Sequence, residues 1–214
     1  MKASFRFTQS LLLVARLVLV LALLIALVQH WGHDYVEALL PLYRLTLNVV
    51  LPDYRVVTLD LLERNNELIV AAHFVTTQAQ TIGTRLLPAG VTLDASTLAS
   101  HAFKHLVIVF GAVFAWPRLA LRERAWRCLF SLPWLLLLEI VDIPLAIAGA
   151  VQDLVYFNLS ADYAAHRPLL VAWLHMLDGG GRLALPLLVA ALVGLWRQRA
   201  YITRDEVSSA ACHT

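Results

Sequence analysis

Charged side chains are scarce in this chain of 214 residues. Asp, Glu, Lys and Arg together make up 15% of it, whereas soluble domains carry about 25%. Hydrophobic residues make up 60%, and the mean hydropathy is +0.70. This composition excludes an ordinary soluble domain and indicates an integral membrane protein surrounded by membrane lipids. The net charge of +2, without a long basic run, also gives no reason to expect a nucleic-acid partner.

Cysteine is nearly absent as well. Cys128 and Cys212 are the only two in the sequence, and neither lies in a pattern typical of a disulfide framework or a zinc site. Both are expected to be plain thiols. His101 and His105 are four residues apart, a spacing compatible with metal binding, but two histidines alone are weak evidence. We therefore expect no metal and no cofactor.

Four apolar segments are long enough to predict membrane-spanning helices. They run over residues 11–28, 97–116, 128–155 and 169–196. The first segment is longer than the core of a secretory signal peptide, and no A-x-A cleavage pattern follows it. Residues 1–32 are therefore expected to be an uncleaved N-terminal signal-anchor helix.

Basic residues predict the orientation of these helices. They precede the first segment, fill the loop 117–127 and follow the last segment. Arg124, in this loop, is expected to be solvated. Because basic residues gather on the cytoplasmic side of membrane proteins, all three places are assigned to the cytoplasm. The prediction is a multi-pass protein with both termini cytoplasmic, a three-helix transmembrane region at 98–200 and a cytoplasmic tail at 201–214.

Residues 33–97 form a small extracytoplasmic α+β segment in this prediction. Tyr35 belongs to a polar and aromatic belt of the kind found at membrane interfaces. The stretch from Asp34 to Pro52 predicts a short amphipathic helix along the membrane surface, interrupted by Pro41.

Alternating polar and apolar residues later in this segment predict a very small antiparallel sheet. Its strands run from 54 to 63, from 68 to 76 and roughly from 81 to 86. Asn65-Asn66 predicts a hairpin turn, because asparagine tolerates positive φ. Asp94 or Ser96 is then expected to cap the second helix, which begins near Thr97. The expected fold class is an all-α transmembrane bundle of four spans, with a small antiparallel β periplasmic insertion between helices 1 and 2.

The apolar segment 128–155 carries two acids in its middle, Glu139 and Asp142. A carboxylate in hydrocarbon costs about 2.5–3.5 kcal/mol, so such residues usually face protein or water and have partners. Their spacing puts both on one helical face, which Ala146, Gly149 and Asp153 continue. A stripe of acids and small residues allows other helices to pack closely.

Ionisable groups of three predicted helices fall at one depth if each residue rises 1.5 Å. From the cytoplasmic ends, the two acids lie about 18–22 Å up, Arg182 about 22 Å and Lys104 with His105 about 17–20 Å. We predict that Arg182 forms a salt bridge with Glu139 or Asp142, because unpaired charges are costly there. The predicted intramembrane polar cluster consists of Glu139, Asp142, Arg182, Lys104, His101, His105 and Asp178.

Two interpretations of this cluster stay open. It is either a set of structural ion pairs that fixes helix register, or a polar pocket, open to the outer side, that binds a polar or peptide group. The stretch Gly179–Gly181 is also ambiguous. It either breaks the last helix near the acids, as in transporters, or marks the start of the last span.

Three stretches stand out between about Tyr43 and Leu185: LYRLTLNVVLPDYRVVTLDLL, LLPAGVTLDASTLASHAF and MLDGGGRLAL. Together they resemble the bacterial exosortase-associated membrane proteins, in particular the exosortase H-associated group. The resemblance implies an inner-membrane protein that works beside an exosortase, a membrane cysteine transpeptidase that processes C-terminal sorting signals. It brings no catalytic residues with it. The chain does not resemble the exosortase itself, because Cys128 lies at the cytoplasmic end of its helix.

Three function classes follow. We favour a non-catalytic accessory or structural subunit of a bacterial inner-membrane complex, with another integral membrane protein as partner, such as an exosortase-type sorting system. One alternative is a small transporter or binding protein with a charged pocket in the outer half of the membrane, although four spans without visible repeats argue against a solitary carrier. The other is an outer-leaflet membrane enzyme. No catalytic residue is assigned, because no Ser-His-Asp or Cys-His arrangement has a persuasive spacing.

Overall fold

The computed structural model describes residues 2–116, 119–160, 163 and 167–195, with side chains from Val14 onward. Three of the described helices are long and apolar enough to cross a membrane: Val14–Val50, Leu121–Leu159 and Leu169–Leu195. The protein is therefore a membrane protein with a mostly helical fold. The predicted tail at 201–214 and the basic residues after the last span lie outside the described residues.

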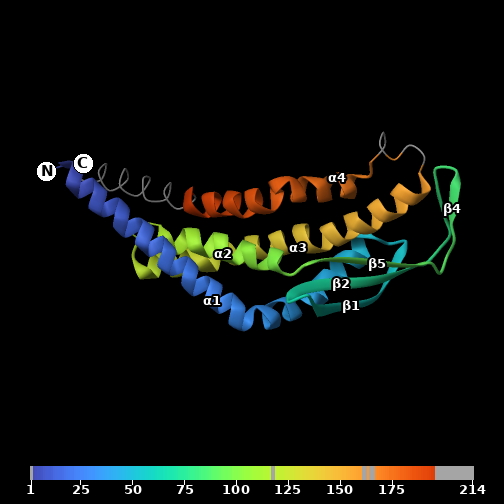
Figure 1. The fold of residues 1–214 in the computed structure, drawn as a ribbon, viewed down its shortest axis with the longest axis horizontal. Helices are drawn as coiled ribbons and strands as arrows, with labels where there is room; N and C mark the ends of the chain where they lie inside the picture. Colours follow the sequence, from blue (N-terminus) through green and yellow to red (C-terminus); the bar gives the residue numbers. More distant parts are fainter. Residues whose placement is uncertain (1, 117–118, 161–162, 164–166, 196–214) are drawn as a thin grey trace, which may run out of the picture.

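The later helices lie along one another, the N-terminal helix crosses them obliquely, and a small sheet packs beside one half of the bundle (Figure 1). In chain order the described elements are α1 (Lys2–Val50), β1 (Tyr54–Arg64), β2 (Glu67–Thr76), β3 (Gln80–Ile82), β4 (Arg85–Leu87), β5 (Thr92–Leu98), α2 (Ser100–Ala115), α3 (Leu121–Leu159), α4 (Leu169–Met176) and the π-helical turn η1 (Leu177–Gly181). After η1 the helix continues through residues 182–195. Helix α2 has 16 residues and is about 24 Å long, which is shorter than the roughly 30 Å of hydrocarbon in a bilayer.

Helix α1 does not end near residue 32, and Pro41 does not interrupt it. The separate surface helix expected after Asp34 is wrong, because the same residues form the last third of α1. Packing explains the difference, since burial of one helix face outweighs one missing N–H group. The buried face consists of Val36, Leu39, Tyr43 and Leu47. Figure 1 shows α1 bending, so that this last third runs alongside the sheet.

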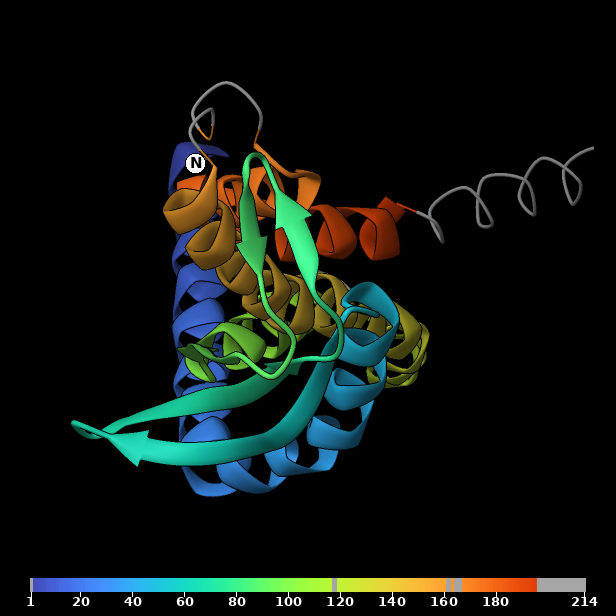
Figure 2. The ribbon, with the colours of Figure 1, turned by 90° about the vertical axis from the view of Figure 1, so that its right-hand side faces the viewer.

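Strands β1, β2 and β5 form an antiparallel sheet in the order β1-β2-β5. The hairpin predicted at Asn65-Asn66 is confirmed, and both asparagines have positive φ, 54° and 61°. The third expected strand, 81–86, is instead a second hairpin of β3 and β4 that turns at Gly83, where φ is 61°. Glycine adopts this conformation without steric cost, which permits the tight turn. Figure 2 shows the β3-β4 hairpin standing at an angle to the three-stranded sheet.

Asp94 and Ser96 do not cap α2, contrary to the prediction. Both lie in β5, and α2 follows Ala99, which makes no side-chain capping bond. Asp and Ser are favoured helix caps, but residues 92–98 also alternate polar and apolar side chains as a strand does. Seven residues of β5 pair with β2. This pairing satisfies backbone groups that a loop would have left to water.

The expected basic loop 117–127 is largely the first turns of α3. Arg124, expected in solvent, is buried and donates a hydrogen bond to the carbonyl oxygen of Trp116 at 3.3 Å. Arg127 is also buried and donates to the carbonyl oxygen of Gly194 at 3.4 Å. The two arginines therefore tie the end of α2 and the end of the last helix to the start of α3.

Two large hydrophobic cores follow each other along α3, and a third, small one lies where its last turns meet β3 and β4. One core contains the inner face of the sheet, the last third of α1 and the second half of α3, with Tyr43, Phe74 and Ile147 among its members. The other lies between α2, the first half of α3 and helix 182–195, with Val109 and Val193 among its members. Helix α3 has 39 residues and is about 58 Å long, so it runs the length of both.

Gly149 brings α3 and α4 into close contact. A Cβ atom at this position would lie 2.6 Å from the carbonyl oxygen of Leu170 and 2.9 Å from Cβ of Leu174. Such an approach is possible only for a residue without a side chain. Gly149 belongs to the stripe of α3 that begins at the two acids. Its small size thus allows the neighbouring helix α4 to pack against this stripe.

Gly149→Ala is expected to destabilise the protein by about 1–3 kcal/mol, because the backbone of α4 has to move away. Gly179→Ala is the matched control, since no heavy atom lies within 4 Å of a Cβ there. Thermal unfolding of both variants in detergent measures the difference. Equal melting temperatures would contradict the close contact.

Candidate functional site

A buried charged cluster surrounds His105, which α2 inserts between two carboxylates of α3. His105 Nδ1 lies 3.1 Å from Glu139 Oε1, and His105 Nε2 lies 3.0 Å from Asp142 Oδ2. None of the three side chains has any exposed surface. The two acids are three residues apart on one helix, so both face α2 and leave a gap that the imidazole fills. An imidazolium, with a proton on each nitrogen, can donate a hydrogen bond to Glu139 and form an ion pair with Asp142.

Glu139 also accepts hydrogen bonds from α1. Tyr43 donates to Oε2 at 2.7 Å, and Tyr35 donates to Oε1 at 3.3 Å. With His105, this carboxylate therefore has three partners from two other helices. Hydrogen bonds to an ionised group are stronger than neutral ones, so the contacts stabilise the charged form of a group that water does not reach.

Asp142 is less completely satisfied. Its Oδ1 lies 3.5 Å from Nε of Arg182, and its Oδ2 faces His105. Neither contact has the direction of a hydrogen bond, so both oxygens are held by ion pairing alone. The pair of Arg182 with an acid of α3 is the contact that the shared depth of these residues predicts.

Arg182 connects the cluster to the surface. Its Nη2 lies 3.3 Å from Oδ1 of Asp178, whose side chain is 60% exposed, whereas the side chain of Arg182 is 9% exposed. Its Nη1 donates to the hydroxyl of Thr97 at 3.5 Å. The guanidinium therefore lies between a buried acid and an exposed one.

Lys104 and His101 do not contact the acids. Lys104 Nζ lies 3.3 Å from His101 Nδ1, in an exposed contact along α2. Lys104 has the depth of His105, but consecutive residues on a helix differ by about 100° in direction. It therefore points away from α3. Of the seven predicted members, Glu139, Asp142, His105, Arg182 and Asp178 are brought together.

The sequence alone does not indicate the role of the two tyrosines. Tyr35 fits an interface belt and Tyr43 fits a surface helix, since a tyrosine can place its hydroxyl in either setting. Their spacing of eight residues, on the face that also carries Leu39 and Leu47, is the signal that could have indicated a shared contact.

Gly180 interrupts the last helix locally. Its φ of 117° and ψ of −5° are not helical, yet the turns before and after it belong to one span, Leu169–Leu195. Glycine is required at such a φ because other residues meet steric strain there. The last span therefore does not begin near Gly179. The π turn ends directly before Arg182 and so sets the direction in which its side chain leaves the helix.

Metal ligands are not gathered in this cluster. Each nitrogen of His105 faces a carboxylate, and His101 contacts Lys104. Among the described residues, one group of three possible ligands lies within reach of a single ion, His33, Asp34 and Glu37 on the exposed face of α1. Exposed acidic groups of this kind are common without a metal. No protein-family model, curated protein or solved structure matches this chain.

Arg182→Ala is expected to destabilise the protein by about 3–5 kcal/mol, because Asp142 stays buried with an incomplete set of partners. The control is Arg122→Ala, which removes an exposed arginine from the start of α3. Arg124, which is expected in solvent from the sequence, is unsuitable as a control because it is buried. Denaturation in detergent compares the variants, and wild-type stability of Arg182→Ala would show that the ion pair is not needed.

Proposed function

We propose that this protein is a non-catalytic accessory subunit of a bacterial inner-membrane complex, in which the helices hold a small sheet in position for a partner. The centre of the charged cluster, which water does not reach, is the observation that carries the proposal. His105, Glu139 and Asp142 have no exposed surface, and neighbouring helices supply their partners. Buried ion pairs without access to solvent suit the fixing of helix register better than substrate binding or turnover.

The proposed topology has four spans and both termini in the cytoplasm. The spans are the three long helices and, in addition, the shorter helix α2. Arg122, Arg124 and Arg127 lie at the start of α3, and the positive-inside rule favours a cytoplasmic position for that end. Helix α3, at about 58 Å, is about twice as long as the hydrocarbon core is thick. Its second half therefore extends beyond the bilayer on the other side. That half packs against the sheet, which supports a periplasmic sheet held close to the membrane.

The first half of α1 supports an intramembrane partner. No residue of its most apolar 18-residue window is buried. Val18, Leu19 and Leu23 expose 61%, 71% and 68% of their surface. Lipid or the helices of another membrane protein can cover such a face. The resemblance to exosortase-associated proteins makes an exosortase one partner to test.

Cysteine labelling tests the topology. In a background with Cys128→Ser and Cys212→Ser, a cysteine replacing Asn66 is expected to react with an impermeant maleimide added to the periplasmic side. A cysteine replacing Arg122 is expected to react only after the membrane is permeabilised. Both positions are exposed. Reaction of both from the same side would exclude the proposed topology.

Photo-crosslinking in native membranes tests the accessory role. Benzoylphenylalanine at Leu23 is expected to capture another membrane protein, because this side chain is 68% exposed on α1. The control position is Val193, which is 2% exposed and faces the protein's own core. Mass spectrometry of the adduct identifies the partner. Adducts with lipid alone, together with a protein that purifies as a clean monomer, would overturn the accessory role.

A small transporter is the second candidate, because the π turn lies beside the charged cluster. Interrupted helices next to ion pairs are typical of transport sites, and here Gly180 precedes Arg182 by two residues. Flux of a proton or solute in proteoliposomes, lost in a folded Asp142→Asn variant, would favour this function over the accessory one.

A further inference from the structure

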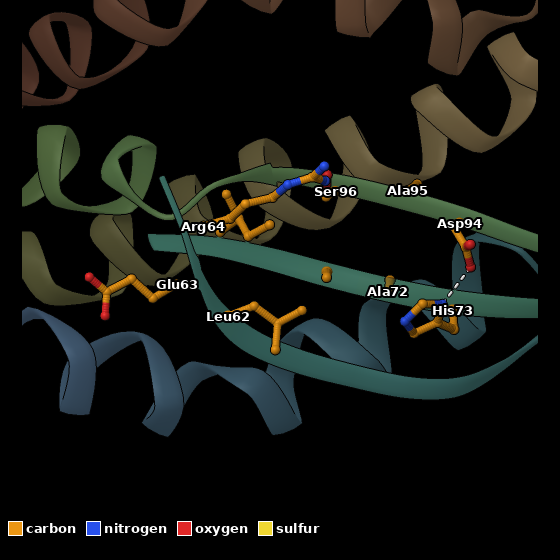
Figure 3. Close-up of a pocket in the computed structure, with 10 residues that line it drawn as sticks. Leu62, Glu63, Arg64, Ala72, His73, Asp94, Ala95 and Ser96 are labelled. Atoms are coloured by element: carbon orange, nitrogen blue, oxygen red, sulfur yellow. Dashed lines mark hydrogen bonds and ion pairs between the residues drawn. The ribbon is translucent and has the colours of Figure 1, made fainter. Parts of the chain in front are cut away.

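The outward face of the sheet carries a hollow that is separate from the charged cluster. Side chains of β2 alternate, so that Val70 and Phe74 are buried in the core, whereas His73 faces outward. The hollow on this outward side has a volume of about 470 Å³. Small-molecule sites usually measure about 300–1,000 Å³. Figure 3 shows it lying across β1, β2 and β5.

A histidine and an aspartate form one end of the hollow. His73 of β2 and Asp94 of β5 are opposite each other in the sheet, and His73 Nδ1 is hydrogen-bonded to Asp94 Oδ1. This bond fixes the imidazole, and Figure 3 shows its other nitrogen pointing along the hollow, away from Asp94. The side chains of His73 and Asp94 are 50% and 74% exposed. Both can therefore contact a bound molecule.

An arginine supplies the opposite charge at the other end. Arg64, at the end of β1, extends across the hollow toward Ser96, whereas Glu63 points away from it (Figure 3). Between the two ends the lining is apolar, with Ile69 and Ala71 in the floor. The hollow thus has a positive end, a negative end and an apolar surface between them.

We propose that this hollow binds the zwitterion of an α-amino acid or dipeptide with an apolar side chain. The guanidinium of Arg64 accommodates the carboxylate in a bidentate pair. The ammonium group lies between the carboxylate of Asp94 and the free nitrogen of His73. The apolar side chain covers Ile69 and Ala71.

Charge and spacing select this class of ligand. A ligand with a carboxylate alone leaves Asp94 paired with His73 only, and an amine alone leaves Arg64 without an anionic partner. Arg64 extends toward Ser96, which is two residues, or about 7 Å, from Asp94 along β5. Such a separation suits a molecule whose two charges lie a few ångströms apart. The site does not depend on the accessory role proposed above, since it involves neither the charged cluster nor the first half of α1.

Calorimetric titration of the full-length protein in detergent tests the proposal with three compounds. Leucine and leucyl-leucine carry both charges, and their relative affinities distinguish an amino-acid site from a dipeptide site. N-acetyl-leucinamide has the same side chain without either charge. We expect at least one zwitterion to bind. The blocked compound should bind at least about tenfold more weakly, because this is the effect of losing a charge-assisted hydrogen bond.

Variants identify the groups that recognise the ligand. Arg64→Gln and Asp94→Asn are each expected to weaken binding about tenfold or more. Arg55→Gln is the matched control, because Arg55 is an exposed arginine of the same strand that does not line the hollow, and it should leave the affinity unchanged. Melting temperatures establish that each variant is folded, and Arg64→Lys replaces Arg64→Gln if the latter is not. Absence of binding by both zwitterions at millimolar concentration, or equal binding of the blocked compound, would overturn the proposal.

Discussion

A charge that is kept from water must find its partners inside the protein, and the acids of α3 impose this requirement on the other helices. Glu139 is satisfied by Tyr43 only because α1 continues past Pro41. Asp142 forms its ion pairs with His105 and Arg182 only if α2 and the last helix stand at matching heights. An unpaired buried charge costs about 3–5 kcal/mol, which is a large part of the about 5–15 kcal/mol that stabilises a typical fold. The relative heights of the helices therefore depend on these few contacts.

The position of the cluster along α3 adds to this effect. Apolar contacts have no preferred direction, so the hydrophobic surfaces of helices can slide past one another at small cost. Ion pairs and hydrogen bonds fix both distance and direction. The cluster lies between residues of the two hydrophobic cores, close to Leu138 on one side and Ile143 on the other. It thus sets the register of both cores at once, and the small sheet packs on a helical surface that the cluster orders.

The sequence predicts the depth of a residue along its helix. It does not predict toward which neighbouring helix the side chain points. Depth along each helix is enough to bring Arg182 and His105 to the level of Glu139 and Asp142. Depth alone also places Lys104 in the cluster. This prediction is wrong, because the side chain of Lys104 leaves α2 on another face. The contact of Tyr43 with Glu139 is not predicted for a different reason. An uncharged tyrosine in an apolar helix does not by itself indicate that a buried partner is present.

Boundaries were predictable only where one local signal acted. Asn65 and Asn66 have the backbone preference of a turn and no competing role, so the first hairpin is as expected. Asp94 satisfies two patterns, a helix cap and an alternating strand, and only its pairing with β2 decides between them. Pro41 likewise ends helices locally, but the buried face around it keeps α1 continuous. Tertiary contacts that no local window contains decide both cases.

Helix α3 passes from one core to the other without a loop, and no flexible linker separates its apolar half from the half that holds the sheet. A rod of about 58 Å that tilts by about 10° moves its far end by about 10 Å. Helices in a bilayer adjust their tilt to its thickness. In the proposed topology, the height and orientation of the sheet, and of the hollow on its outer face, are therefore coupled mechanically to the thickness of the surrounding membrane.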